Sequence, residues 1–189
     1  WTAHSTLQGL ERERQTLEAL WTWQTLDIVK PELLLEGLAA KDFHARAAAV
    51  RIMSHWLPRL EPQAEWRERA KALALDEHPR VRLEAIRLLG TIPNAESALA
   101  ALEAFGLERD RYLDYALLVT LRDLKTQWLP EVNKENPAFT DNAERLLFAL
   151  DAVASEDVVP ALIHALAKGR FNDDQTVKAW QWCHYKPLL

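Results

Sequence analysis

The sequence is poor in glycine, with five residues among 189. Proteins built from sheets usually need more, because glycine readily adopts the positive φ angles of tight turns. Cysteine is scarcer still, and the single Cys183 excludes an internal disulfide without fixing the compartment. No apolar run approaches the ~18 residues that a bilayer-spanning helix needs. These shortages predict an all-α chain that does not enter a membrane.

One stretch of the sequence occurs twice, thirty-six positions apart, at residues 41–53 and 77–89. Small, apolar and basic positions recur in register. The coinciding pairs are Arg46 and Arg82, Ala49 and Ala85, Val50 and Ile86, Arg51 and Arg87, and Met53 and Leu89. Self-similarity at this period is typical of an α-solenoid, whose units bury their apolar faces only by stacking on neighbours.

Proline marks most boundaries between apolar-periodic segments, since its missing N–H costs little in the first turn of a helix. The prolines in such positions are Pro31, Pro62, Pro79, Pro93, Pro137 and Pro160. The predicted helices span residues 11–26, 31–40, 43–57, 62–75, 79–90, 93–105, 110–126, 138–154, 157–168 and 173–184. They pair into about five hairpins of one elongated domain, residues 1–189, with sub-blocks 1–133 and 137–189 on either side of a polar segment.

The repeat also predicts which side chains are buried. One stripe at helical spacing consists of Val81, Ala85, Leu88 and Leu89, and its counterpart consists of Ala45, Ala49, Ile52 and Met53. The small residues Ala49 and Ala85 allow a neighbouring helix to approach closely. Residues 112–116 are interpreted as a third copy, with Ala116 in the small position.

The segment from Asp76 to Ala85 resembles a HEAT repeat. In that family an aspartate at the turn between the helices and an arginine early in the second helix form a ladder between successive units. The resemblance therefore implies a right-handed α-solenoid of HEAT-like hairpins and a ladder of Asp76, Arg46 and Arg82. The preceding copy departs from the pattern, because Ala40 stands in the place of the aspartate.

Three longer segments, 18–24, 81–87 and 110–124, together resemble the HEAT region of large haem-binding dehydrogenase-like proteins of planctomycetes and verrucomicrobia. The resemblance covers about residues 10–130. Those proteins join a propeller similar to sugar dehydrogenases, HEAT repeats and a c-type cytochrome domain with a Cys-x-x-Cys-His motif. The resemblance implies a scaffold from an exported or periplasmic protein whose other parts carry haem c. The first residue, Trp1, agrees with a segment of a longer chain.

The sequence Trp180-Gln181-Trp182-Cys183-His184 contains half of a haem-attachment motif. Covalent attachment uses two cysteines, and Trp180 occupies the place of the first. We therefore expect Cys183 to pack as a small apolar residue and predict no cofactor in this chain. The spacing of the histidines, such as His44 and His55, predicts no metal site. No glycine-rich phosphate loop or nucleophile elbow is present, so no catalytic residue is predicted.

Positive charge is concentrated in the middle of the chain, although the formal net charge is −5. Residues 41–90 contain eight Arg and two Lys against seven acidic residues, which gives +3. Residues 1–40 and 91–189 carry −3 and −5. The repeated arginines are therefore the strongest indication of function in the sequence.

Two interpretations of these arginines stay open. They bind an anionic partner, or they fasten one repeat to the next through carboxylates. The candidate carboxylates are Asp42, Asp76 and Glu84. Arg46 and Arg82 fit the fastening role, whereas Arg51 and Arg87, one turn further along each helix, are the candidate partner surface.

The function predicted from these patterns is a non-catalytic scaffold that binds proteins, either flanking redox domains or another subunit. One alternative is a DNA-binding enzyme resembling the HEAT-like alkylpurine DNA glycosylases. Net acidity argues against nucleic acid, because phosphate binding depends on clustered Lys and Arg. A bilin-lyase-type HEAT protein is a further alternative that rests on repeat chemistry alone.

Overall fold

A computed structural model describes residues 9–153 and 155–185, with side chains for all of these except Leu10 and residues 180–185. Within that part of the chain the protein is helical and has no strand, which confirms the all-α prediction. The α-helices there are α1 (Leu10–Thr25), α2 (Pro31–Leu38), α3 (Phe43–Trp56), α4 (Gln63–Leu73), α5 (Pro79–Leu89), α6 (Ala95–Glu103), α7 (Arg111–Asp123), α8 (Lys125–Asn133), α9 (Pro137–Thr140), α10 (Ala143–Val153), α11 (Val159–Ala167) and α12 (Asp173–Tyr185). Short 3-10 turns follow α3 and α6 and precede α11.

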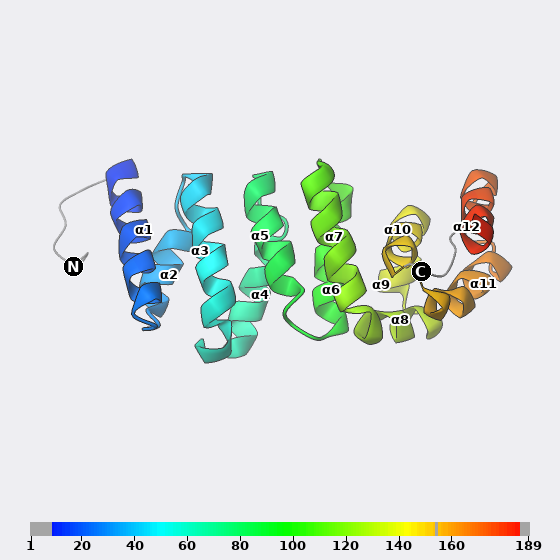
Figure 1. Cartoon of the computed structure of the whole chain (residues 1–189), viewed down its shortest axis with the longest axis horizontal. Helices are drawn as coiled ribbons and strands as arrows, with labels where there is room; N and C mark the ends of the chain where they lie inside the picture. The colour runs from blue at the N-terminus through cyan, green and yellow to red at the C-terminus, as the bar shows by residue number, and fades with distance from the viewer. Residues whose placement is uncertain (1–8, 154, 186–189) are drawn as a thin grey trace.

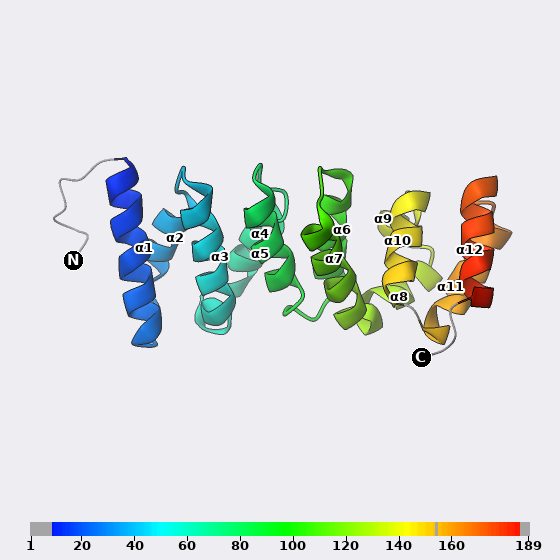
Figure 2. The same cartoon turned by 45° about the horizontal axis from the view of Figure 1, so that its top comes forward.

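The helices stand side by side in two layers (Figures 1 and 2). One layer consists of α1, α3, α5, α7, α10 and α12, and each of these helices contacts the next. In the other layer α4 contacts α6, α6 contacts α8, and α8 contacts α11. Helices therefore pack on elements that are near in sequence, and α1 and α12 lie at opposite ends of an elongated array.

Side-chain caps fix where α3, α5 and α7 begin. Asp42 precedes α3 and accepts a hydrogen bond from the backbone N–H of His44 at 3.0 Å. This bond, with a second from the His44 ring, lowers the pKa of Asp42 below its usual 3.8. His78 caps α5 through Nδ1, and Asp110 caps α7 by accepting from two backbone N–H groups.

The caps set the register of the repeats and correct one prediction. Ala49 and Ala85 each lie seven residues after their cap, and both are fully buried. The seventh residue after Asp110 is Leu117, so Ala116 does not occupy the predicted small position. Ala116 is the sixth residue and corresponds to Glu84 in α5. The predicted match pairs Ala116 with Ala85 at a spacing of thirty-one residues, whereas the caps His78 and Asp110 are thirty-two residues apart, so it is displaced by one position.

Small residues bring the helices close together at the start of the array. The two predicted stripes are buried throughout, which confirms them. A Cβ added at Gly37 of α2 would lie 2.8 Å from Leu20 Cδ1 and 3.0 Å from Ala49 Cβ. The contact of α2 with α1 and α3 therefore depends on the absence of a side chain at Gly37 and on the short side chain of Ala49.

Two predicted helices differ from the structure. The predicted helix 110–126 ends at Asp123 as α7, and α8, which was not predicted, begins two residues later at Lys125 in a different direction (Figure 1). The predicted helix 138–154 is interrupted at 141–142, where Asn142 accepts a hydrogen bond from the N–H of Arg145 at 2.9 Å and starts α10. Trp128 explains the first break, because its Nε1–H donates to the carbonyl of Leu121 at 2.8 Å near the end of α7.

Two apolar clusters fill the space between the layers. One extends from α1 to α7 and the other from α6 to α12, and Phe148 packs against both. The second cluster includes Val132 and Phe139, on either side of the polar segment 134–136. Packing is therefore continuous across the segment that the sequence marks as a boundary.

Candidate functional site

Arg46 is a buried arginine that pairs with the mostly buried Asp76 and, through Nη2, with the exposed Glu77 at 3.1 Å. Its Nε and Nη2 donate to the two carboxylate oxygens of Asp76 at 3.0 Å each, and Nη1 donates to the carbonyls of Ala40 and Lys41. The hydrogen bond to Asp76 is the main cause that raises the pKa of Arg46 above its usual value. A bidentate pair of this geometry joins α3 rigidly to the turn before α5.

Arg82 repeats only part of this arrangement. Its Nη1 donates to the carbonyls of Asp76 at 2.9 Å and Glu77 at 3.1 Å, and its Nη2 donates to the carbonyl of Glu108. Its Nε is buried and has no hydrogen-bond partner among the described residues. Arg82 therefore contacts the next unit through the backbone carbonyl of Glu108, whereas Arg46 contacts the next unit through the carboxylate of Asp76.

The arginine series stops at α7. Counted from the caps, the residue that corresponds to Arg46 and Arg82 is Asp114. Its carboxylate lies 3.0 Å from Nε of Arg109, whose guanidinium stands over the ring of Phe105 at 3.7 Å. The contacts of Arg46 and Arg82 therefore connect α3, the turn before α5 and the turn before α7.

Arg51 and Arg87, the candidate partner surface, both lie beside Glu84. The Glu84 side chain is 3% exposed, whereas Arg51, Arg80 and Arg87 are 53%, 48% and 64% exposed. Arg80 and Arg87 lie 3.1 Å and 3.4 Å from its oxygens, and Arg51 donates to both of them. The hydrogen bond to Glu84 raises the pKa of Arg51. Three guanidinium groups around one carboxylate leave two positive charges at the surface.

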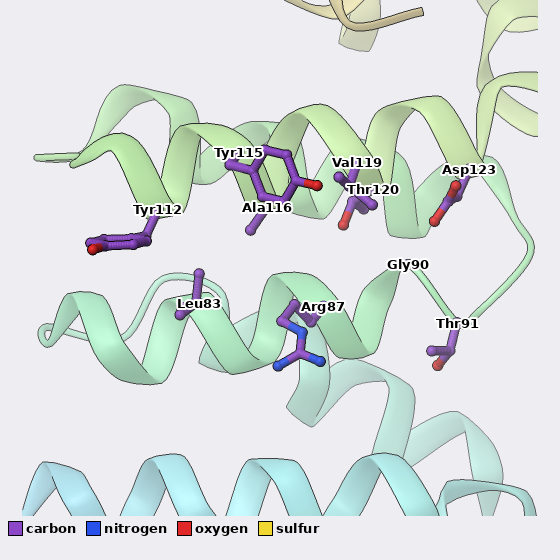
Figure 3. A pocket seen from close by; sticks show the side chains of 10 residues that line it. All are labelled: Leu83, Arg87, Gly90, Thr91, Tyr112, Tyr115, Ala116, Val119, Thr120 and Asp123. Atoms are coloured by element: carbon purple, nitrogen blue, oxygen red, sulfur yellow. The ribbon is translucent and has the colours of Figure 1, made fainter.

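A groove of about 490 Å³ lies beside this arginine cluster, between α5 and α7 (Figure 3). Leu83 and Arg87 come from α5, and the other wall comes from α7. Tyr112 and Tyr115 are 58% and 69% exposed on that wall. The full lining is Leu83, Arg87, Gly90, Thr91, Tyr112, Tyr115, Ala116, Val119, Thr120 and Asp123. The size is in the range of sites that hold small ligands or single side chains.

Sequence reasoning placed Arg87 in the site but missed the two tyrosines. Tyr112 and Tyr115 are three residues apart, so they share a helix face, and that face is opposite the buried Leu113 and Leu117. This spacing was the available signal.

The histidines that were considered as metal ligands do not form a metal site in the described part of the chain. In the described part of the chain, no group of three or more His, Cys, Asp or Glu side chains is placed to hold a metal ion. His44 instead lies 3.0 Å from its neighbour Asp42. The side chains of the half haem motif, Trp180–His184, lie outside the described residues. No described helix has both the length and the hydropathy of a membrane span.

Comparison with protein-family models, curated proteins and solved structures finds no match.

The buried carboxylate of Glu84 leads to a first prediction. Replacing Glu84 with glutamine is expected to lower the free energy of unfolding by about 1–3 kcal/mol, because the arginines lose charged acceptors and repel one another. The loss is expected to shrink as NaCl rises, since half-exposed charges are screened. Urea denaturation at low and high salt measures both effects.

Glu68→Gln is the matched control for Glu84→Gln. Glu68 is an exposed acceptor of Lys71 on α4, and its loss is expected to cost less than about 0.5 kcal/mol. Equal losses for the two variants, or a loss at Glu84 that grows with salt, would contradict this role of Glu84.

Proposed function

We propose that the chain is a right-handed α-solenoid of five HEAT-like hairpins, formed by α2–α3, α4–α5, α6–α7, α8–α10 and α11–α12, with α1 in front. The support is the packing of successive helices in the layer from α1 to α12 and the contacts of α2 with α3, α4 with α5, α6 with α7 and α11 with α12. Such an array has no enclosed centre and presents long faces, which is how solenoids bind partners.

Arg46, Asp76 and Arg82 form the repeat ladder in this proposal. The bidentate pair of Arg46 with Asp76 joins the first two units, and the contact of Arg82 with the Glu108 carbonyl joins the next. The ladder fixes the spacing of α3, α5 and α7, so the groove between α5 and α7 keeps a defined width.

The proposed function is a non-catalytic scaffold that binds protein on the outer face of α3, α5 and α7. The observation that carries it is the position of the half-exposed arginine cluster directly beside an apolar groove with two exposed tyrosines. Arginine and tyrosine are the residues most enriched at the energetic centres of protein interfaces. The setting that we propose, between a propeller and a c-type cytochrome domain of an exported protein, rests on the resemblance alone.

Binding of DNA through the same face is the competing function. The charge balance weighs against it, because Arg51, Arg80 and Arg87 already share Glu84. A phosphate backbone is best held by several arginines without acidic neighbours. The groove is also lined mainly by apolar side chains, which offer a phosphate no hydrogen bond.

Site-specific photo-cross-linking in cells that produce the protein tests this function. A photoreactive residue replaces the exposed His55 of α3, and a control chain carries it at the exposed Arg67 of α4 in the other layer. We expect adducts at position 55 that protease removes and nuclease does not, and few adducts at position 67. Nuclease-sensitive adducts, or equal adducts at both positions, would overturn the proposal.

A further inference from the structure

The groove lies at a helix position that carries a long side chain in one repeat and a short one in the next. Glu84 lies six residues after the cap of α5, and Ala116 lies six residues after the cap of α7. Glu84 therefore lies at the contact of α3 with α5, and Ala116 lies at the corresponding contact of α5 with α7. A long side chain occupies the first place and a methyl group the second.

The residues around these two positions differ in the same way. Beside Glu84, Arg51 of α3 and Arg80 of α5 extend over the carboxylate and cover the space between the helices. The residue that corresponds to Arg80 in the next repeat is Tyr112, which forms a wall of the groove. Ion pairs thus bridge α3 and α5 at this position, whereas the groove lies at the corresponding position between α5 and α7.

The floor of the groove is held by a direct contact of the two helices. Thr120 Oγ1 donates to the carbonyl of Ile86 at 3.1 Å, and this bond is buried. A Cβ at Gly90 would lie 3.1 Å from the same hydroxyl. The floor is therefore formed by the small residues Gly90 and Thr120, and the Thr120 hydroxyl is already hydrogen-bonded. The space above them is available to an apolar side chain of a partner.

Charged side chains lie along both edges of the groove. Arg87 lies along the α5 edge and is the most exposed arginine of the cluster (Figure 3). Arg111 adds a cation beside Tyr112, whose hydroxyl accepts from its Nη2 at 2.7 Å. Asp123 is at the opposite end from Tyr112. A ligand with a carboxylate near Arg87 and an apolar group over Ala116 complements this arrangement.

We propose that the groove binds an extended peptide segment of a partner protein, with an apolar or aromatic side chain between Leu83 and Tyr115 and a nearby carboxylate paired with Arg87. This inference rests on the proposed protein-binding function and specifies the chemistry of the partner. The two tyrosines supply contact area at low entropic cost, and the guanidinium supplies a bidentate site for the carboxylate.

The test is selection of a random-peptide phage library on the intact wild-type chain, followed by fluorescence anisotropy with the enriched peptide. We expect a consensus that joins an acidic residue to an aromatic or aliphatic one. Tyr115→Ala and Arg87→Glu, both at exposed positions, are expected to weaken binding roughly tenfold or more. Ala116→Glu is expected to weaken it as well, because it fills the groove as Glu84 fills its neighbour.

Arg67→Glu, on α4, is the matched control for charge reversal and is expected to leave the affinity unchanged. Circular dichroism of each variant verifies the fold, and the exposed positions keep the test valid if Ala116→Glu unfolds. A consensus without an acidic residue, equal binding by Tyr115→Ala, or no enriched peptide would overturn the inference. Self-association abolished by Tyr115→Ala would assign the groove to a second copy and overturn it too.

The outcomes separate this inference from the function on which it rests. Peptides that bind equally to the wild-type chain and to the Tyr115→Ala and Arg87→Glu variants would remove the groove as their site and leave protein binding intact. Nuclease-sensitive cross-links at position 55, together with a library that enriches no peptide, would remove both.

Discussion

Replacing Arg46 with methionine is expected to lower the free energy of unfolding by about 3–5 kcal/mol, because it leaves a mostly buried carboxylate without its partner. The Asp76 side chain is 12% exposed and receives two hydrogen bonds from Arg46. Two backbone carbonyls, of Ala40 and Lys41, lose donors at the same time. Urea denaturation followed by circular dichroism measures the change.

Arg82→Met is the internal control, since it removes the corresponding arginine of the next repeat. Its partners are backbone carbonyls and no carboxylate, so the expected loss is smaller, about 1–3 kcal/mol. If both variants lose the same free energy of unfolding, the ion pair of Arg46 with Asp76 does not stabilise the protein more than the carbonyl contacts of Arg82 do.

Replacing Trp128 with alanine is expected to lower the stability of the second half of the array by about 3–5 kcal/mol. The indole is fully buried, stacks on Phe139 at 6.2 Å between ring centroids, and donates to the carbonyl of Leu121. Its loss creates a cavity and frees the end of α7. Hydrogen exchange is expected to show lost protection in α8 and α10, with α3 and α5 protected, because repeats depend mainly on their neighbours.

Trp21→Ala is the matched control for this cavity. Trp21 is 50% exposed, so its truncation is expected to change stability by less than about 0.5 kcal/mol. Loss of protection spread evenly over the whole chain would contradict the local role of Trp128.

The first half of the fold could be predicted because the apolar residues that recur in the sequence repeat there are the same residues that are buried between the helices. Prolines at helix starts and stripes at helical spacing gave α2, α3 and α5 to within a few residues of their bounds. The breaks at Leu124 and Asn142 could not be predicted, because apolar periodicity continues across both. They depend on contacts made after the chain turns, such as the indole of Trp128 on the Leu121 carbonyl.

The candidate site was only half visible in the sequence. The repeated arginines indicated Arg51 and Arg87, but not that both share the buried Glu84. The groove lies where Ala116 takes the place that Glu84 has in the preceding repeat, counted from the caps. Matching Ala116 with Ala85 by residue type uses a spacing of thirty-one residues, one fewer than between the two caps, and so overlooks the open space beside Ala116.

The most direct test of the central claim, that the face over α5 and α7 binds a partner segment, is chemical-shift mapping of the selected peptide on the methyl-labelled chain. We predict that the methyl signals of Leu83 and Val119 shift, while those of Ile163 and Val177 near the other end remain unchanged. Shifts confined to Ile163 and Val177 would contradict the account.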